Sequence, residues 1–214
     1  MDTDPVLLTA PTSQEMAAFT TLIDGARTMA LVCGVGPAAT ACALTRFLER
    51  YPVRAVLLCG IGGTYPRSDV GIGDVALAGS EILADLGRCT ESGIVPLELP
   101  GETPRIRFLL EDTARRILGS VPPGAAFAPM ATVSCTSGTM ERAELIARHT
   151  GAWVENMEGA AAALVCTEYC VPLIEIRGIS NVAGDPDRSG WRIDKALART
   201  AEAAECILTS MLRT

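Results

Sequence analysis

Short apolar runs alternate with segments of helical periodicity along the whole chain. Residues 55–59 (Ala-Val-Leu-Leu-Cys) contain no charged or polar break, as expected of a strand that is covered on both faces. Residues 38–50 place Leu44, Leu48 and Cys42 on the expected inward side of a helix. Strands that alternate with helices form a largely parallel sheet between helical layers. The sequence therefore predicts a three-layer α/β/α sandwich around a mostly parallel mixed sheet.

The same patterns predict the other elements and show no shift in composition that would divide residues 1–214 into two domains. The expected strands are 6–10, 29–35, 55–59, 74–78 with 81–85 as its continuation, 126–133, 152–156 and 172–179. The expected helices are one capped by Ser13, then 38–50, 103 to about 118, 140–149, 159–170 and 191–213. Residues 90–102 and 184–190 are expected to be surface loops, because they are rich in Gly, Pro and charged residues.

The charge balance excludes several classes of partner. The 214 residues carry a net charge of −7, which makes nucleic acid and anionic membranes poor partners. No apolar run reaches the length that spans a bilayer, and the acidic start of the chain lacks the positive region of a signal peptide. We expect a cytoplasmic enzyme.

The eight cysteines do not form a metal-binding or disulfide pattern. They contain no C-x-x-C pair, and a single histidine excludes a histidine-rich metal site. We expect them to be small buried apolar residues in a reducing compartment. They stand at positions 33, 42, 59, 89, 135, 166, 170 and 206.

Polar side chains stand where two apolar runs end. The first run leads into Glu155-Asn156-Met157-Glu158, and the second closes with Ser180-Asn181. Ligands of open α/β sheets bind at such carboxyl ends. A carboxylate there can accept two hydrogen bonds from vicinal hydroxyls, as a ribose requires. The alternative for either acid is a cap at the start of the following helix.

Glycine-rich segments follow two other predicted strands. Residues 34–39 fit the dinucleotide pattern G-x-G-x-x-A, but the strand that follows ends without the acid that would hold a ribose, so a dehydrogenase is a distant alternative. Residues 60–63 (Gly-Ile-Gly-Gly) are expected to form a turn that brings the backbone close to a ligand. Glu15 follows the first strand and faces the same end of the sheet, although an acid at a helix start also stabilises the helix dipole.

Together these segments resemble the purine nucleoside phosphorylase/nucleosidase superfamily over nearly the whole chain. The motifs that carry the resemblance are residues 34–39, 60–63, 73–75, 154–161 and 177–180. The resemblance implies hydrolysis or phosphorolysis of a nucleoside without a metal or cofactor, in a homo-oligomer. It implies that Glu15 activates water, that Glu158 holds the ribose hydroxyls and that Met157 packs against the sugar.

The resemblance also implies the position of the base. Gly62 and Gly63 would lie close to it, and residue 181 would face the nitrogen at position 7 of the purine. Ser180 is also expected to bind the substrate. Adenine-specific nucleosidases of the superfamily carry aspartate there as a general acid, whereas this chain carries Asn181. An amide cannot act as that acid, but it can donate hydrogen bonds to the position-7 nitrogen and the 6-oxo group of hypoxanthine. Asn181 therefore favours a 6-oxopurine.

Within the superfamily, the chain most resembles the futalosine hydrolases, whose substrate carries hypoxanthine. Residues 132–139, 84–87, 177–181 and 187–191 carry this resemblance. The sequence leaves open what recognises the benzoate end of that substrate, for which Arg67, Arg88 and Arg188 are candidates by charge alone.

Other functions stay open from the sequence. A nucleoside phosphorylase needs cations around phosphate, and residues 10–15 and 60–65 carry none, although Arg67 and Arg88 could fold in. A methylthioadenosine/S-adenosylhomocysteine nucleosidase is disfavoured by Asn181. A non-catalytic nucleoside-binding protein would keep the glycines and Glu158 but could dispense with Glu15.

Overall fold

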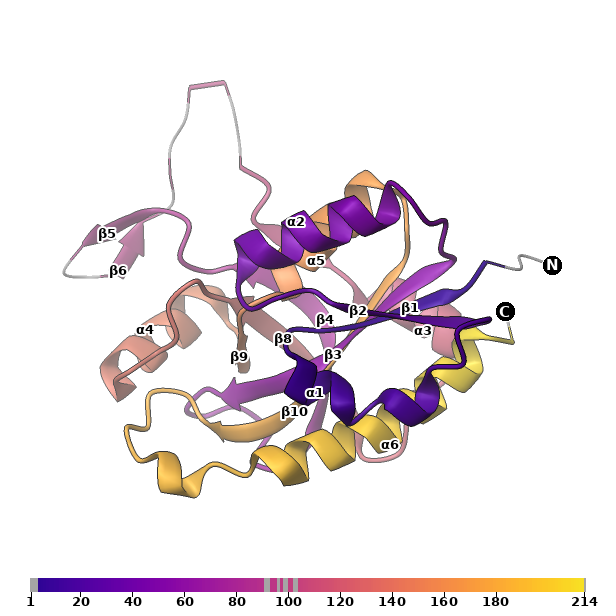
Figure 1. Cartoon of the computed structure of the whole chain (residues 1–214). Helices are drawn as coiled ribbons and strands as arrows, with labels where there is room; N and C mark the ends of the chain where they lie inside the picture. The colour runs from indigo at the N-terminus through magenta and orange to yellow at the C-terminus, as the bar shows by residue number, and fades with distance from the viewer. Residues whose placement is uncertain (1–3, 91–92, 96, 98–99, 102–103, 214) are drawn as a thin grey trace.

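The computed structural model describes residues 4–90, 93–95, 97, 100–101 and 104–213 (Figure 1). Parts of the predicted loop 90–102 and the predicted helix start at Thr103 lie outside the described residues. Most strands belong to one mixed sheet, and β5 and β6 form a small separate one. The strands are β1 (Val6–Ala10), β2 (Thr28–Val32), β3 (Ala55–Thr64), β4 (Val75–Leu83), β5 (Arg88–Thr90), β6 (Gly93–Val95), β7 (Arg107–Leu109), β8 (Ala125–Thr132), β9 (Val154–Asn156) and β10 (Leu173–Val182). The helices are α1 (Ser13–Ala17), α2 (Pro37–Leu48), α3 (Glu111–Leu118), α4 (Met140–Thr150), α5 (Gly159–Glu168) and α6 (Ile193–Met211), with short 3₁₀ turns at Thr20–Leu22 and Arg188–Gly190.

Parallel pairs dominate the main sheet, as the sequence predicts. β1 lies parallel to both β2 and β3, β3 to β10, and β8 to both β4 and β9. Antiparallel pairs join β10 to β4, β3 to β9 and β7 to β4. The strands β3, β10, β4, β8 and β9 therefore form a closed ring of pairings, from which β1 and β2 extend as an open sheet. The alternating pattern of the sequence does not reveal this ring.

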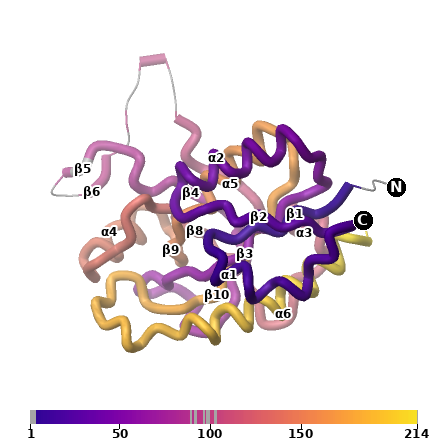
Figure 2. The backbone as a smooth tube through the Cα atoms, in the orientation of Figure 1, coloured from indigo at the N-terminus to yellow at the C-terminus, as the bar shows by residue number. Residues whose placement is uncertain are grey.

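Helices cover both faces of the sheet (Figures 1 and 2). α2 and α5 pack together on one face, whereas α1, α3 and α6 lie on the other. One apolar cluster joins Leu44 of α2 to the strands, and a second joins Phe19 and Ile207 to the opposite face. These three side chains are fully buried, and each such burial contributes about 1.5–3 kcal/mol of transfer free energy. The predicted sandwich is confirmed.

Two predicted element boundaries are wrong. Residues 60–63 form no turn, because β3 continues through them to Thr64 and pairs with both β10 and β9. The helix predicted from Thr103 begins only at Glu111, because residues 107–109 form β7 against the edge of β4. In both places a partner strand available only in the folded protein overrides the local sequence preference.

The prediction that the cysteines are buried holds for part of the set. Cys33, Cys59 and Cys166 are buried, whereas Cys42 lies on the exposed side of α2, contrary to the inward position expected for it. Three further cysteines are also exposed: Cys135, Cys170 and Cys206. Among the described residues, no helix is long and apolar enough to cross a membrane.

Candidate active site

A pocket of about 470 Å³ lies at the carboxyl ends of β1, β3, β9 and β10. All of the site residues predicted from the sequence line it: Glu15, Gly62, Gly63, Met157, Glu158, Ser180 and Asn181. The segments that supply them are distant in sequence but meet in the fold, as the indigo α1 beside the yellow-orange β10 shows in Figure 2. The predicted convergence of these residues is therefore observed, while their individual roles stay predictions.

Glu15 is held in place by the start of α1. The side chain that caps this helix is Thr12, not the predicted Ser13, and its hydroxyl oxygen accepts a hydrogen bond from the Glu15 amide at 3.1 Å. The same hydroxyl donates to Glu15 Oε2 at 2.8 Å. Glu15 Oε1 accepts a hydrogen bond from the Ile61 amide at 3.2 Å. This buried carboxylate is thus fixed at the pocket wall by contacts to two elements.

Glu158 is also buried, at the start of α5. Its Oε1 accepts a hydrogen bond from the Gly36 amide at 3.1 Å, and its Oε2 lies 3.0 Å from Arg177 Nη1. Gly36 takes a φ of 90°, which an L side chain rarely adopts, so the glycine of the 34–39 motif directs an amide at this carboxylate. Each carboxylate oxygen keeps further lone pairs for hydroxyl groups in the pocket.

The two acids around Met157 have different surroundings. Glu155 accepts hydrogen bonds from the Tyr65 hydroxyl at 2.9 Å and from the amide and hydroxyl of Ser137 at 2.9 and 2.5 Å. Burial, followed by the Glu155 charge, raises the pKa of Tyr65 and keeps its hydroxyl as a donor. Glu155 therefore ties the 136–138 segment to β3, whereas Glu158 retains acceptor capacity toward the pocket.

Neither acid caps α5 with its side chain. The Asn156 carboxamide oxygen accepts hydrogen bonds from the amides of Glu158 and Gly159 at 2.9 and 2.8 Å. Glu158 does occupy the N-cap position of α5, as the alternative assigned to one of the acids, but its carboxylate makes no capping hydrogen bond. With the helix amides satisfied by Asn156, the carboxylate of Glu158 can turn into the pocket.

A β-bulge presents Ser180 and Asn181. Ile179 pairs with Gly62 and Asn181 with Gly63, which leaves Ser180 as the extra residue. The Ser180 hydroxyl lies 2.7 Å from Asn181 Oδ1, and Asn181 Nδ2 donates to the Val182 carbonyl at 3.0 Å. These two contacts fix the amide orientation and leave one N–H of Asn181 for a ligand. Gly63 makes room for it, because a Cβ there would stand 3.2 Å from Asn181 Nδ2.

Beneath the pocket lies a buried ionic cluster that the sequence analysis missed. Arg177 pairs with Glu158 and, through Nε at 2.9 Å, with Glu175. Glu175 meets Glu81 beside Gly159, where any Cβ would collide with both carboxyl groups. Gly60 similarly makes room for the arginine, since a Cβ there would stand 2.6 Å from Arg177 Nη1.

The charges of this cluster determine its proton content. Burial raises the pKa of both Glu81 and Glu175. The charge of Glu175 adds to the rise at Glu81, whereas Arg177 and the hydrogen bond with Glu81 act to lower the pKa of Glu175 without cancelling the effect of burial. Burial alone would lower the pKa of Arg177, but the carboxylates of Glu175, Glu158 and Glu15 outweigh it and the pKa is raised. The arginine therefore stays charged, while burial favours a proton on the Glu81–Glu175 pair.

The held proton makes stability depend on pH in a defined direction. Because the folded-state pKa of Glu81 lies above the ordinary value of 4.5, its stabilisation is complete below that value and is lost as pH rises through the raised pKa. In Glu81→Gln, the amide reproduces the hydrogen bonding of the protonated acid. Its oxygen can accept a hydrogen bond from Asn156 Nδ2, and its NH₂ group can donate to Thr132 Oγ1. The Thr132 hydroxyl can then turn to Asn156 Oδ1, which lies 3.1 Å away. We expect the fall in unfolding free energy as pH rises above 4.5 to become flatter, by up to about 1.4 kcal/mol per pH unit.

Urea unfolding of the two proteins across this range measures the effect. The exposed Glu202→Gln is the matched control and should keep the pH dependence of the original chain. Identical slopes for Glu81→Gln and the original chain would contradict the assignment of the proton to this pair.

The sequence did contain one signal of the cluster. Glu175 and Arg177 are charged residues two positions apart in an otherwise apolar run, and charged side chains are buried almost only when paired. Their partners Glu81 and Asn156 come from other strands, so the pairing itself is visible only in the structure.

The pocket is poor in cations. Two arginines line it, Arg177 and Arg188, whereas Arg67 lines a second, smaller hollow beside α4 and Arg88 lies in β5. Within the described part of the chain, no group of three or more His, Cys, Asp and Glu side chains is arranged to hold a metal ion.

Comparisons with known proteins agree with this geometry. Residues 8–213 match the family model described as the phosphorylase superfamily. The futalosine hydrolase of Thermus thermophilus is 36% identical over 185 residues, which cover 83% of this chain and 80% of that protein. The futalosine hydrolase of Streptomyces coelicolor is also 36% identical, with 81% and 75% covered. A solved futalosine hydrolase mutant of Helicobacter pylori superimposes with a TM-score of 0.79 at 19% identity, over 98% of this chain and 99% of that one.

The match to the family model spans nearly the whole sequence, and the relatives exceed a third identity over most of it. The resemblance inferred from the motifs is thereby confirmed. The chain belongs to the phosphorylase superfamily.

Proposed function

We propose that this protein is a futalosine hydrolase, which cleaves the N-ribosidic bond of futalosine with water and releases hypoxanthine and dehypoxanthinyl futalosine. The observation that carries the proposal is the fixed Asn181 amide in a pocket that also holds Glu15 and Glu158. The relatives named as futalosine hydrolases support it.

The two acids have complementary tasks in this reaction. As the bond to the base stretches, the ribose becomes positively charged, and Glu158 holds its hydroxyls and supplies nearby negative charge. Glu15 takes the proton from the attacking water as a general base. Its contacts with Thr12 and Ile61 set the direction from which water is activated.

Asn181 stabilises the departing base. The hydroxyl of Ser180 holds the amide oxygen, so the remaining N–H faces the acceptor edge of a 6-oxopurine, where negative charge gathers. One N–H already donates to Val182, so the amide offers the base one donor rather than the two that the sequence suggested.

Base release decides the function. The purified protein is incubated with futalosine, inosine or methylthioadenosine, each with and without phosphate, and the bases are separated by chromatography. Hypoxanthine released from futalosine without dependence on phosphate supports the proposal. Release from inosine only with phosphate would make the protein a phosphorylase, and adenine release would make it a methylthioadenosine nucleosidase.

The phosphorylase alternative has little support in the pocket. A phosphate needs an available cation, yet Arg177 is paired with Glu158 and Glu175. Glu15 also lines the pocket, and its carboxylate would repel phosphate. A non-catalytic binding protein would show affinity for the nucleoside without release of a base.

Changing Asn181 to aspartate tests its role directly. The ionised carboxylate of Asn181→Asp would face the 6-oxo group and the ring nitrogen, both acceptors, so we expect kcat/KM for futalosine to fall by about 10²-fold or more. The change also removes the N–H donated to Val182, so Asn181→Ala serves as the control for loss of that contact. Equal turnover by Asn181→Asp and the original chain would contradict the role given to the amide.

Assembly and location stay predictions. A homo-oligomer, implied by the resemblance, can be tested by light scattering after gel filtration. A cytoplasmic location and the organisation of residues 1–214 as one domain are likewise proposed.

A further inference from the structure

We propose that Arg188 and Trp191 form a subsite for an aromatic carboxylate at the outer end of the pocket. The inference rests on the proposed function, because the benzoate end of futalosine is such a group. It assigns a task to the 187–191 motif, which the chemistry at the base and the ribose does not use.

Arg188 is the cation available to a ligand. The pocket is lined by four acids, Glu15, Glu155, Glu158 and Asp185, and by two arginines. The charge of Arg177 is engaged by Glu175 and Glu158. Among the described residues, no acid lies within ion-pair distance of Arg188, whose side chain is exposed on the pocket wall. An anionic ligand in this pocket therefore has one guanidinium free to receive it.

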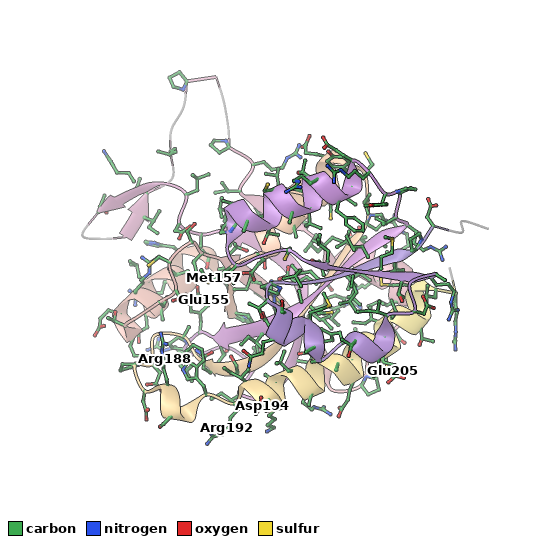
Figure 3. The ribbon with its side chains drawn as sticks, in the orientation of Figure 1. Glu155, Met157, Arg188, Arg192, Asp194 and Glu205 are labelled. Carbon is green, nitrogen blue, oxygen red and sulfur yellow. The ribbon has the colours of Figure 1, made fainter. Side chains whose placement is uncertain are left out.

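The loop holds Arg188 in position. The Asp187 carboxylate accepts hydrogen bonds from the amide and the hydroxyl of Ser189, both at 2.9 Å, and so caps the 3₁₀ turn at Arg188–Gly190. Asp187 is thus occupied by Ser189 instead of neutralising Arg188. Figure 3 shows Arg188 on the side of the loop toward Glu155 and Met157, with Arg192 and Asp194 at the outer border of the molecule.

Trp191 supplies the aromatic surface. The Arg188 guanidinium carbon lies 5.5 Å from the centre of its ring, a stacking that leaves the edges of the guanidinium free for a carboxylate. The indole N–H is buried without an acceptor among the described residues.

Part of the pocket wall is apolar or small. Val35, Pro186 and Ile193 line the pocket together with Gly138. A planar apolar ring that ends in a negative charge fits such walls better than a second sugar or a phosphate would, because those ligands need many polar partners. The combination of a stacked arginine, an indole and apolar walls identifies an aryl carboxylate.

Kinetics on a charged and an uncharged substrate test the subsite. KM and kcat are measured for futalosine and for its methyl ester, in the original chain, in Arg188→Gln and in Arg192→Gln. We expect Arg188→Gln to raise KM for futalosine by about tenfold or more while kcat changes by less than about twofold. The methyl ester should be converted equally by the original chain and by Arg188→Gln. Arg192 donates to the Ser189 and Trp191 carbonyls and does not line the pocket, so Arg192→Gln is the control for charge and for loop stability.

A KM that rises equally for the acid and the ester in Arg188→Gln would overturn the subsite, and so would an unchanged KM for futalosine. A second measurement is independent of turnover: benzoate is titrated against each protein by tryptophan fluorescence, with benzyl alcohol as the neutral analogue. Benzoate affinity that falls about tenfold in Arg188→Gln alone supports the subsite. If the original chain releases no base from futalosine, the proposed function fails, while benzoate binding still decides the subsite.

Discussion

Replacement of Glu15 by glutamine is expected to lower kcat for base release by about 10³-fold, within the range of about 10²–10⁴ for loss of a general base. The amide cannot take a proton from water. It can still accept the hydrogen bond from the Ile61 amide and contact the Thr12 hydroxyl, so the shape of the pocket should be kept. Because the change acts on the transition state, KM should change much less than kcat.

The rate of bond cleavage in a single turnover, followed as the hypoxanthine formed, measures this effect without interference from slow product release. The exposed Glu111→Gln, which alters an acid outside the pocket, should retain the full rate. A Glu15→Gln rate within tenfold of the original would mean that another group activates the water.

Replacement of Arg177 by methionine is expected to produce the largest loss of stability, about 3–5 kcal/mol of unfolding free energy. The side chain is 1% exposed and neutralises Glu158 and Glu175 at 3.0 and 2.9 Å. Methionine can fill much of the space but leaves buried carboxylates without a counter-charge. Since small proteins have about 5–15 kcal/mol in total, the variant would be close to unfolding.

Urea denaturation at several pH values separates charge from packing. The loss in Arg177→Met should shrink toward acid pH, where the buried Glu175 carboxylate, whose pKa is raised, takes up a proton and no longer needs the arginine. Arg148→Met, which removes an exposed pair with Glu144 at 3.3 Å, should cost about 0.5 kcal/mol or less. A similar loss in both variants would show that the cluster contributes little.

The sequence was informative where local pattern and tertiary structure agree. Apolar runs such as 6–10 became strands because they are covered on both faces. Glu158 and Asn181 could be assigned to the site because they are polar residues at the ends of apolar runs, where ligands of open α/β sheets bind. The resemblance then placed Glu15, which local pattern left between a catalytic and a helix-stabilising role.

The remaining features depended on partners from elsewhere in the chain. Glycines at 60–63 suit either a turn or a strand, and only pairing with β10 and β9 selects the strand. The 107–109 segment became β7 because β4 offered an edge, although a helix was predicted there. Arg177 was overlooked as a charged residue because nothing in the linear pattern indicates which acids surround it.

The origin of the pocket walls links ligand affinity to the integrity of the whole molecule. The walls come from residues 11–15, 35, 61–63, 136–138, 155–158 and 177–197. No contiguous fragment carries the complete site, so a partly unfolded chain should bind substrate weakly or not at all. By thermodynamic linkage, a ligand at about 100 times its dissociation constant adds about 2.7 kcal/mol to the unfolding free energy. A tight inhibitor should therefore stabilise destabilised variants whose changes lie outside the pocket, such as those in the apolar cluster of Phe19 and Ile207, by drawing the population back to the native state.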